Sequence, residues 1–113
     1  MSKPAALTTH ILDTAKGGPA QGVTVELFRI EASGPVKVTE RLTNADGRTD
    51  APLMGAADFV GGVHELRFHV GAYFAGAGFL DVVPIVVTLR AGEGHYHVPL
   101  LCSPWSYSTY RGS

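Results

Sequence analysis

The sequence predicts an all-β protein, a β-sandwich formed by one domain that spans residues 1–113. Two observations support this prediction. Short runs in which polar and apolar side chains alternate with period two recur along the chain, and clusters of glycine, proline, asparagine and aspartate separate them. The chain has 113 residues, of which 45% are hydrophobic and 17% charged, which suits a single globular core. About seven short strands joined by turns are typical of a sandwich.

The N-terminal half contains three predicted strands bounded by turn residues. In the clearest, VTVELFRIE, valine and leucine alternate with threonine, glutamate and phenylalanine, so the two faces of the strand meet different surroundings. The later sequence NADG is a turn signal, because Gly47 can adopt a positive φ. Strands are expected at residues 7–14, 23–31 and 36–43, with the turn at 44–47.

The C-terminal half contains the remaining strands and one short helix. The sequence GAYFAGAGF lacks strict alternation and is expected to form one or two turns of helix. The run VVPIVVTLR has the most buried character, and Pro84 stands near its start, where a missing N–H group is tolerated. Strands are expected at residues 63–70, 82–90, 95–102 and 105–113, and the helix within 71–79.

The last two strands form a predicted hairpin whose faces follow from period two. In HYHVPLLC every second residue from Tyr96 onward is apolar, and this face is expected to point into the core. Trp105 and Tyr107 are expected to pack against it there. An even-numbered loop around Ser103-Pro104 then places His97 opposite Tyr110 or Gly112. An odd-numbered loop would set Arg111 against His97 and put Trp105 outside, which is less plausible.

The opposite face of this hairpin is a candidate interface or site. It mixes histidine, proline, leucine, serine and tyrosine, a set too apolar for open solvent and too polar for a core. By the same parity, Arg111 points away from this face, so it reaches a ligand there only through a bulge or from another subunit. The residues expected on the face are His95, His97, Pro99, Leu101, Ser106, Ser108 and Tyr110.

Composition excludes some partners and favours one compartment. The formal charge of −1 offers no electrostatic footprint for nucleic acid or an anionic membrane. Cys102 is the only cysteine, so an internal disulfide and a thiolate metal cluster are both ruled out, and a reducing compartment is favoured. No secretory signal and no apolar run of membrane-spanning length is evident. The expected location is therefore cytoplasmic.

Individual candidate residues each have an ordinary structural interpretation. On local sequence alone, His10 is a strand histidine with satisfied hydrogen bonds, and Arg48 a solvated cation at a strand edge. His95 and His97, spaced i, i+2, lie on one strand face and could bind a metal, but a closed metal site needs about four ligands. His64 and His69 suggest only packing and solvation.

Other catalytic arrangements find little support. No nucleophile elbow of the form G-x-S-x-G and no phosphate-binding glycine loop is present. Cys102 lies on the predicted core face, which favours an inert, buried thiol. The aspartates show no pairing that suggests acid–base catalysis; they are Asp13, Asp46, Asp50 and Asp58.

Three segments carry a resemblance to a known family. LTTHILDTAKGGPAQGVTVELFRI, NADGRTD and HYHVPLLCSPWSYSTYRGS are similar to the transthyretin-related 5-hydroxyisourate hydrolases, and the similarity spans nearly the whole chain. The closing YRGS is the tetrapeptide that distinguishes this family from true transthyretins, which share its fold and hairpin. The resemblance implies a transthyretin-like sandwich of two four-stranded sheets with one short helix. It also implies a homotetramer, a dimer of dimers with active sites at the dimer–dimer interface.

The resemblance further implies a reaction and a set of site residues. The reaction is the hydrolysis of 5-hydroxyisourate, an unstable product of urate oxidation, to 2-oxo-4-hydroxy-4-carboxy-5-ureidoimidazoline, with no cofactor; a bound metal would inhibit rather than assist. His10 and His97 would handle water and protons, and Arg48 would stabilise developing charge. Ser113 would orient a histidine or the water, and the substrate would contact His10, Arg48, Ser108, Tyr110 and Arg111.

Two alternatives to an enzyme remain open at this point. One is a carrier that binds small aromatic ligands in the same channel, as transthyretin does. The other is a structural sandwich whose polar face is only a dimer interface. Either alternative predicts that Arg48→Ala or His97→Ala leaves the protein's function intact.

Overall fold

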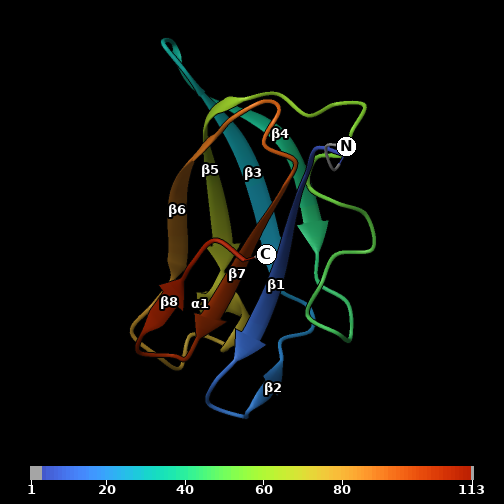
Figure 1. The fold of residues 1–113 in the computed structure, drawn as a ribbon. Coiled ribbons are helices and arrows are strands. Elements are labelled where there is room, and N and C mark those ends of the chain that lie inside the picture. The colour runs from blue at the N-terminus through green and yellow to red at the C-terminus, as the bar shows by residue number, and fades with distance from the viewer. Residues whose placement is uncertain (1–3, 113) are drawn as a thin grey trace.

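Two four-stranded β-sheets that face each other form the protein (Figure 1). The computed structural model describes residues 4–112. Strand order is β2-β1-β7-β8 in the first sheet and β4-β3-β5-β6 in the second, and a single short helix lies between β5 and β6 in the chain. The predicted all-β sandwich with one helix is therefore confirmed. The elements are β1 (Ala6–Asp13), β2 (Gly18–Pro19), β3 (Thr24–Glu31), β4 (Gly34–Leu42), β5 (Gly62–His69), α1 (Val70–Tyr73), β6 (Val82–Leu89), β7 (His95–Cys102) and β8 (Tyr107–Thr109).

Alternation of side chains along the central strands builds the core between the sheets. In β1 every second residue is buried, so Leu7 and Ile11 point inward while Thr8 and His10 lie on the half-buried outer face. Each fully buried leucine or isoleucine contributes about 1.5–3 kcal/mol through removal of apolar area from water. The other large, fully buried apolar side chains are Leu27, Leu53, Met54, Leu66, Phe68, Leu89 and Leu100.

The pairing of β1 with β7 is parallel, whereas all the other strand pairs are antiparallel. Parallel pairing joins strands that are remote in sequence, here the first and the seventh. Its register aligns Thr8 with His97 and His10 with Pro99. The outer faces of β1 and β7 consequently form one continuous surface, on which the candidate site lies.

The helix is shorter than its sequence predicts. We expect up to two turns within residues 71–79, and the structure contains one turn, Val70–Tyr73. The Tyr73 hydroxyl donates a hydrogen bond of 2.8 Å to Oδ2 of the buried Asp13, whose Oδ1 accepts the N–H groups of Ala15 and Lys16. Asp13 thus has a structural role, in which it ties the end of β1 to its turn and to α1.

The C-terminal hairpin has the predicted even-numbered loop, with Ser103 N–H bonded to Ser106 O across it. Leu101 pairs with Ser108, and an isolated bridge pairs His97 with Gly112, the second of the two predicted registers. The regular strand β8 is shorter than the expected 105–113.

The prediction that Trp105 and Tyr107 pack in the core is wrong. Trp105 is 67% exposed and Tyr107 is 44% exposed. Period two assigns the faces of a strand but does not say whether a second layer covers each face. Trp105 lies in the loop before β8, and Tyr107 begins β8, the edge strand of its sheet; residues 4–112 of a single chain leave both rings exposed.

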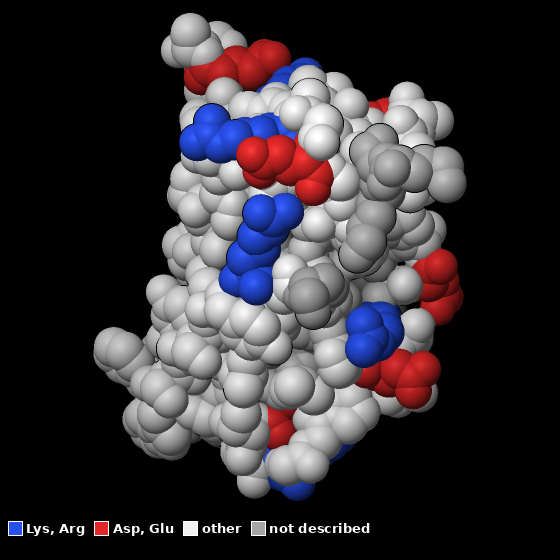
Figure 2. Space-filling view, in the orientation of Figure 1, with Lys and Arg blue, Asp and Glu red and all other residues white. Residues whose placement is uncertain are grey.

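Charged side chains are dispersed over the surface. On the face shown in Figure 2, lysine and arginine lie singly or beside acidic residues, and no continuous area of one sign forms. Among residues 4–112, no helix has the length and apolar character needed to cross a membrane.

Candidate functional site

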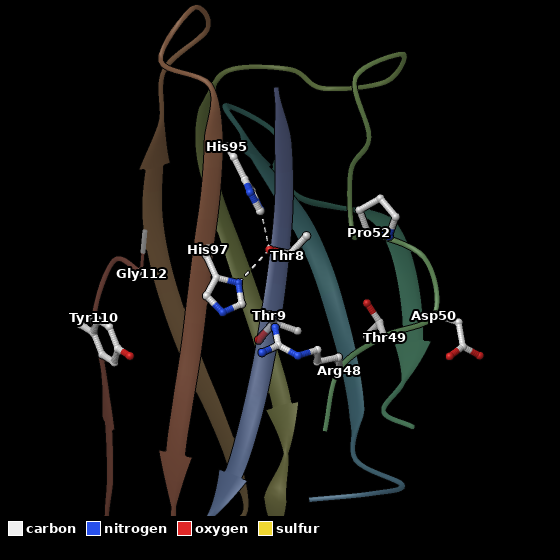
Figure 3. Close-up of a pocket in the computed structure, with 10 residues that line it drawn as sticks. All are labelled: Thr8, Thr9, Arg48, Thr49, Asp50, Pro52, His95, His97, Tyr110 and Gly112. Carbon is white, nitrogen blue, oxygen red and sulfur yellow. Dashed lines mark hydrogen bonds between the residues drawn. The ribbon is translucent and has the colours of Figure 1, made fainter. Parts of the chain in front are cut away.

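A pocket of about 490 Å³ opens on the outer face of the first sheet (Figure 3). Its volume falls within the roughly 300–1,000 Å³ of small-molecule sites. Residues from β1, β7, the loop that precedes Met54 and the C-terminal segment contribute to its walls. The lining residues are Thr8, Thr9, Arg48, Thr49, Asp50, Pro52, His95, His97, Tyr110 and Gly112.

The parallel pair β1–β7 places a hydroxyl between two imidazole rings. Thr8 Oγ1 lies 2.6 Å from Nε2 of His95 and 2.8 Å from Nδ1 of His97. The two rings are 6.2 Å apart between centroids and inclined by 66°. Both rings line the pocket, His97 half-buried and His95 exposed (Figure 3).

Arg48 reaches the pocket from a loop that runs alongside β1. Because β2 is only two residues long, most of this edge of β1 is open to other segments. An isolated antiparallel bridge joins His10 with Arg48, and Ile11 N–H donates to Gly47 O at 2.8 Å. Gly47 has φ +74°, and a Cβ there would lie 2.4 Å from Ile11 O, so glycine is required for this close approach.

Asn44 holds the backbone of this loop. Its Oδ1 accepts the N–H groups of Asp46 at 2.9 Å and Arg48 at 3.2 Å, and its own N–H donates to Arg48 O at 2.8 Å. Its Nδ2 donates to Asp50 Oδ1 at 2.9 Å. An Asn side chain that bonds nearby backbone in this way stabilises a tight turn. The guanidinium of Arg48 therefore extends from a fixed base.

The C-terminal segment closes another side of the pocket. Gly112 N–H donates to His97 O at 2.7 Å, which anchors the segment to β7 beyond the end of β8. Tyr110 lines the pocket from this segment, and its ring is drawn with the hydroxyl directed toward the pocket (Figure 3).

The electrostatics of the pocket favour a neutral imidazole at His97. Burial lowers the pKa of His97 below its ordinary value of 6.5, and the positive charge of Arg48 lowers it further, with smaller effects from His95 and His10. A neutral imidazole can accept a proton at neutral pH. Beside it, Arg48 supplies a permanent positive charge and planar N–H donors. This combination suits a reaction in which water loses a proton and an oxygen gains negative charge.

The predicted site residues do not all meet in this pocket. Arg48, His97 and Tyr110 line it. His10 is not among the lining residues; it lies on the same face of β1 as Thr8, and its backbone is bridged to that of Arg48. Ser108 lies on β8 and does not line the pocket, and Ser113 lies outside the described residues.

Arg111 lies on the other side of the C-terminal segment, as strand parity predicts. Its guanidinium stacks 4.0 Å from the centre of the Tyr96 ring, and Nη1 is 4.0 Å from Glu93 Oε1. There it lines a second groove, of about 330 Å³, whose other wall consists mainly of β6 residues.

Several pocket residues were not predicted from the sequence. Thr8 shares a strand face with His10, which could have indicated it, but the parallel partner β7 could not be identified from the sequence. Thr49, Asp50 and Pro52 follow Arg48 directly in the chain and carry no chemical signal of their own.

Within residues 4–112, no group of three or more His, Cys, Asp or Glu side chains is arranged to hold a metal ion. His95 and His97, the pair considered for a metal, both bond the Thr8 hydroxyl.

Comparison with known proteins agrees with this fold. Residues 7–112 match the model of the HIUase/Transthyretin family. The 5-hydroxyisourate hydrolase of Deinococcus radiodurans is 53% identical, over 100% of both chains. The crystallised 5-hydroxyisourate hydrolase of Klebsiella pneumoniae is 37% identical with a TM-score of 0.82, over 100% of this chain and 97% of that one. Transthyretin from Sparus aurata is 31% identical with a TM-score of 0.87, over 95% and 96% of the two chains. The chain belongs to the HIUase/Transthyretin family.

Proposed function

We propose that this protein is an enzyme that hydrolyses 5-hydroxyisourate, which places it in the degradation of urate. Full-length similarity to proteins named for this activity supports the assignment, and the identity to the Deinococcus radiodurans hydrolase, 53%, exceeds the 31% to Sparus aurata transthyretin. The observation that carries it is a half-buried histidine with a lowered pKa next to Arg48 in a pocket of suitable size. A passive channel for an aromatic ligand has no need of this pair.

The proposed reaction begins with water attack on a ring carbonyl of the substrate. His97 accepts a proton from the water, and the Arg48 guanidinium stabilises the oxyanion that forms on the carbonyl oxygen. The C–N bond of the ring amide then breaks, and the leaving nitrogen receives a proton. The product carries a carboxylate and a ureido group, and no cofactor is needed.

The remaining site residues have proposed supporting roles. His10, whose backbone is bridged to that of Arg48, is proposed to assist proton transfer to the leaving nitrogen. Tyr110 binds the substrate from the C-terminal segment. Ser108 and Arg111 are proposed to contact substrate only in an assembly, since neither lines the pocket of a single chain. Ser113 is proposed to orient a histidine or the water.

We also propose a homotetramer, a dimer of dimers in which the pocket lies at the dimer–dimer interface. Exposed aromatic side chains support an assembly: Phe79 is 76% and Trp105 67% exposed. The lone cysteine supports a cytoplasmic location.

The decisive experiment generates 5-hydroxyisourate in place from urate and urate oxidase and follows its ultraviolet decay. We expect the wild-type protein to accelerate the decay, and Arg48→Gln and His97→Asn to lower kcat/KM by about 10²–10³. Arg29→Gln is the matched control, because this exposed arginine pairs with Glu31 on β3, in the other sheet. Wild-type protein that binds the substrate saturably without accelerating its decay would instead identify a carrier.

A further inference from the structure

The Thr8 hydroxyl forms hydrogen bonds with both His97 and His95. Among residues 4–112 it is the only side-chain hydroxyl that bonds His97. The distances of 2.8 Å to His97 Nδ1 and 2.6 Å to His95 Nε2 are those of full hydrogen bonds. The β1–β7 register determines this contact, because it aligns Thr8 with His97 while His95 lies two residues earlier on the same face.

The number of protons restricts how these three groups can be arranged. A threonine hydroxyl carries one proton, so it can donate to only one ring and must accept from the other, unless it accepts from both. A neutral imidazole has one N–H and one lone pair, so the choice at Thr8 determines which nitrogen of His97 remains free as a base.

Arg48 favours one arrangement. The second nitrogen of His97, Nε2, points away from Thr8 toward the side of the pocket where the Arg48 guanidinium lies (Figure 3). A guanidinium has only N–H donors and a positive charge, so it disfavours a proton on Nε2. The proton of His97 then resides on Nδ1 and is donated to Thr8, and Thr8 donates its own proton to Nε2 of His95.

We propose that Thr8 is a positioning residue for this hydrolysis, and that the chain His97–Thr8–His95 holds His97 as the Nδ1–H tautomer with its Nε2 lone pair directed at the attacking water. This inference rests on the proposed function. Thr8 also lines the pocket, but in this role it acts through His97 and not on the reacting atoms. His95 completes the chain. Its Nε2 accepts a hydrogen bond from the Thr8 hydroxyl, which leaves the hydroxyl lone pairs directed toward His97.

The chain also stabilises the imidazolium that forms when His97 accepts a proton. In the proposed arrangement the Nδ1–H of His97 donates to Thr8, and Thr8 donates to His95. These two hydrogen bonds become more polarised as positive charge develops on His97. The neighbours that lower the pKa of His97 by their charge are Arg48, His95 and His10. Thr8 is therefore the neutral acceptor through which the new charge is spread.

The test compares Thr8→Val, which keeps the shape of the side chain, with Thr8→Ser, which keeps the hydroxyl. We expect Thr8→Val to lower kcat about 10–100-fold with KM changed less than about threefold, a smaller loss than the roughly 10²–10⁴-fold that a general base itself contributes. Thr8→Ser should retain most of the activity. His95→Ala should cause a smaller loss than Thr8→Val, because Thr8 can still accept from His97. Thr14→Val is the control: it removes a hydroxyl from the turn after β1 that bonds only Cys102 O.

A second measurement on the free protein separates this inference from the proposed function. Long-range ¹H–¹⁵N spectra of the histidine rings report the tautomer of His97 without any substrate. The expected result is Nδ1–H in the wild type and a shift toward Nε2–H in Thr8→Val. A wild-type His97 protonated on Nε2, or a Thr8→Ser variant as impaired as Thr8→Val, would overturn the inference. If the wild-type protein does not turn over the substrate, the proposed function is refuted. The tautomer measured for His97 would then still show whether Thr8 controls the protonation of that ring.

Discussion

Gly112 and His97 are in contact through both backbone and side chain. The Gly112 N–H donates to His97 O at 2.7 Å, and a Cβ built on Gly112 would lie 2.7 Å from Cδ2 of the His97 ring. This glycine of the closing YRGS sequence therefore lets the chain end pass directly beside the proposed general base. Flexibility of the backbone is not the reason for glycine here, since its φ is not in the left-handed region.

Gly112→Ala is expected to displace the His97 ring and lower kcat at least about tenfold, because a small misplacement of a catalytic group costs up to about 10² in rate. Turnover of 5-hydroxyisourate by the variant is the measurement. Gly18→Ala is the control: its Cβ would meet only Lys16 Cε, at an ordinary 3.6 Å. Wild-type kcat in Gly112→Ala would show that His97 tolerates the contact.

Arg48→Gln is expected to move the acid limb of the pH profile to higher pH. Burial and the Arg48 charge both lower the pKa of His97, so the wild-type limb lies below the ordinary value of 6.5. Without the Arg48 charge, burial remains as the main cause of the lowered pKa of His97. The pKa therefore rises part of the way toward 6.5. The dependence of kcat/KM on pH for both proteins measures the shift. A limb that stays in place or moves to lower pH contradicts the role of Arg48.

Removal of residues 110–113 is expected to abolish turnover while the oligomer survives. The deletion takes away Tyr110 and the Gly112 anchor on β7 but leaves β8 complete at Thr109. Light scattering after gel filtration reports the assembly, and the ultraviolet assay reports activity. A truncated protein with normal rates would refute a catalytic role for the C-terminal segment.

The Cys102 thiol is expected to be inert in the folded protein. It is fully buried, and burial together with the nearby Asp13 carboxylate raises its pKa to about 11. The thiolate, which is the reactive form, is then about one part in 10³ at pH 8. Labelling with a chromogenic disulfide should be very slow in buffer and complete in guanidinium chloride. Rapid labelling of the native protein would show that the thiol is accessible.

His64→Leu is expected to stabilise the fold. His64 is fully buried in β5; its Nδ1–H bonds Gly62 O at 3.0 Å, but Nε2 finds no partner among the described residues. Removal of an unsatisfied buried acceptor should raise the free energy of unfolding by about 1 kcal/mol, measured by urea denaturation. His69→Leu, on the opposite face of the same strand, removes a hydrogen bond of 2.6 Å with Glu26 Oε1 and should lower the free energy of unfolding slightly. A destabilised His64→Leu variant contradicts the prediction.

Much of the local structure could be predicted from period two alone. The faces of β7 follow from counting residues, and Arg111 lies on the side that parity requires. The even-numbered hairpin loop is confirmed, but its prediction rested on a buried Trp105, and it left His97 opposite either Tyr110 or Gly112. The same counting failed for Trp105 and Tyr107, because the burial of a face depends on what packs against it. Trp105 lies in the hairpin loop and Tyr107 on the edge strand β8, and residues 4–112 of one chain supply no layer over either ring.

The sequence by itself determined the fold class, the strand faces and the chemical groups available for a site, because these depend on local spacing and side-chain type. Only the tertiary structure decided which groups meet. The parallel pairing of β1 with β7 brings Thr8 between His95 and His97, and the loop beside β1 brings Arg48 to the same pocket. The contact of Thr8 with His97 joins residues that are 89 positions apart in the sequence. No local pattern encodes such a contact, because the packing of the whole sandwich selects the partner of each strand.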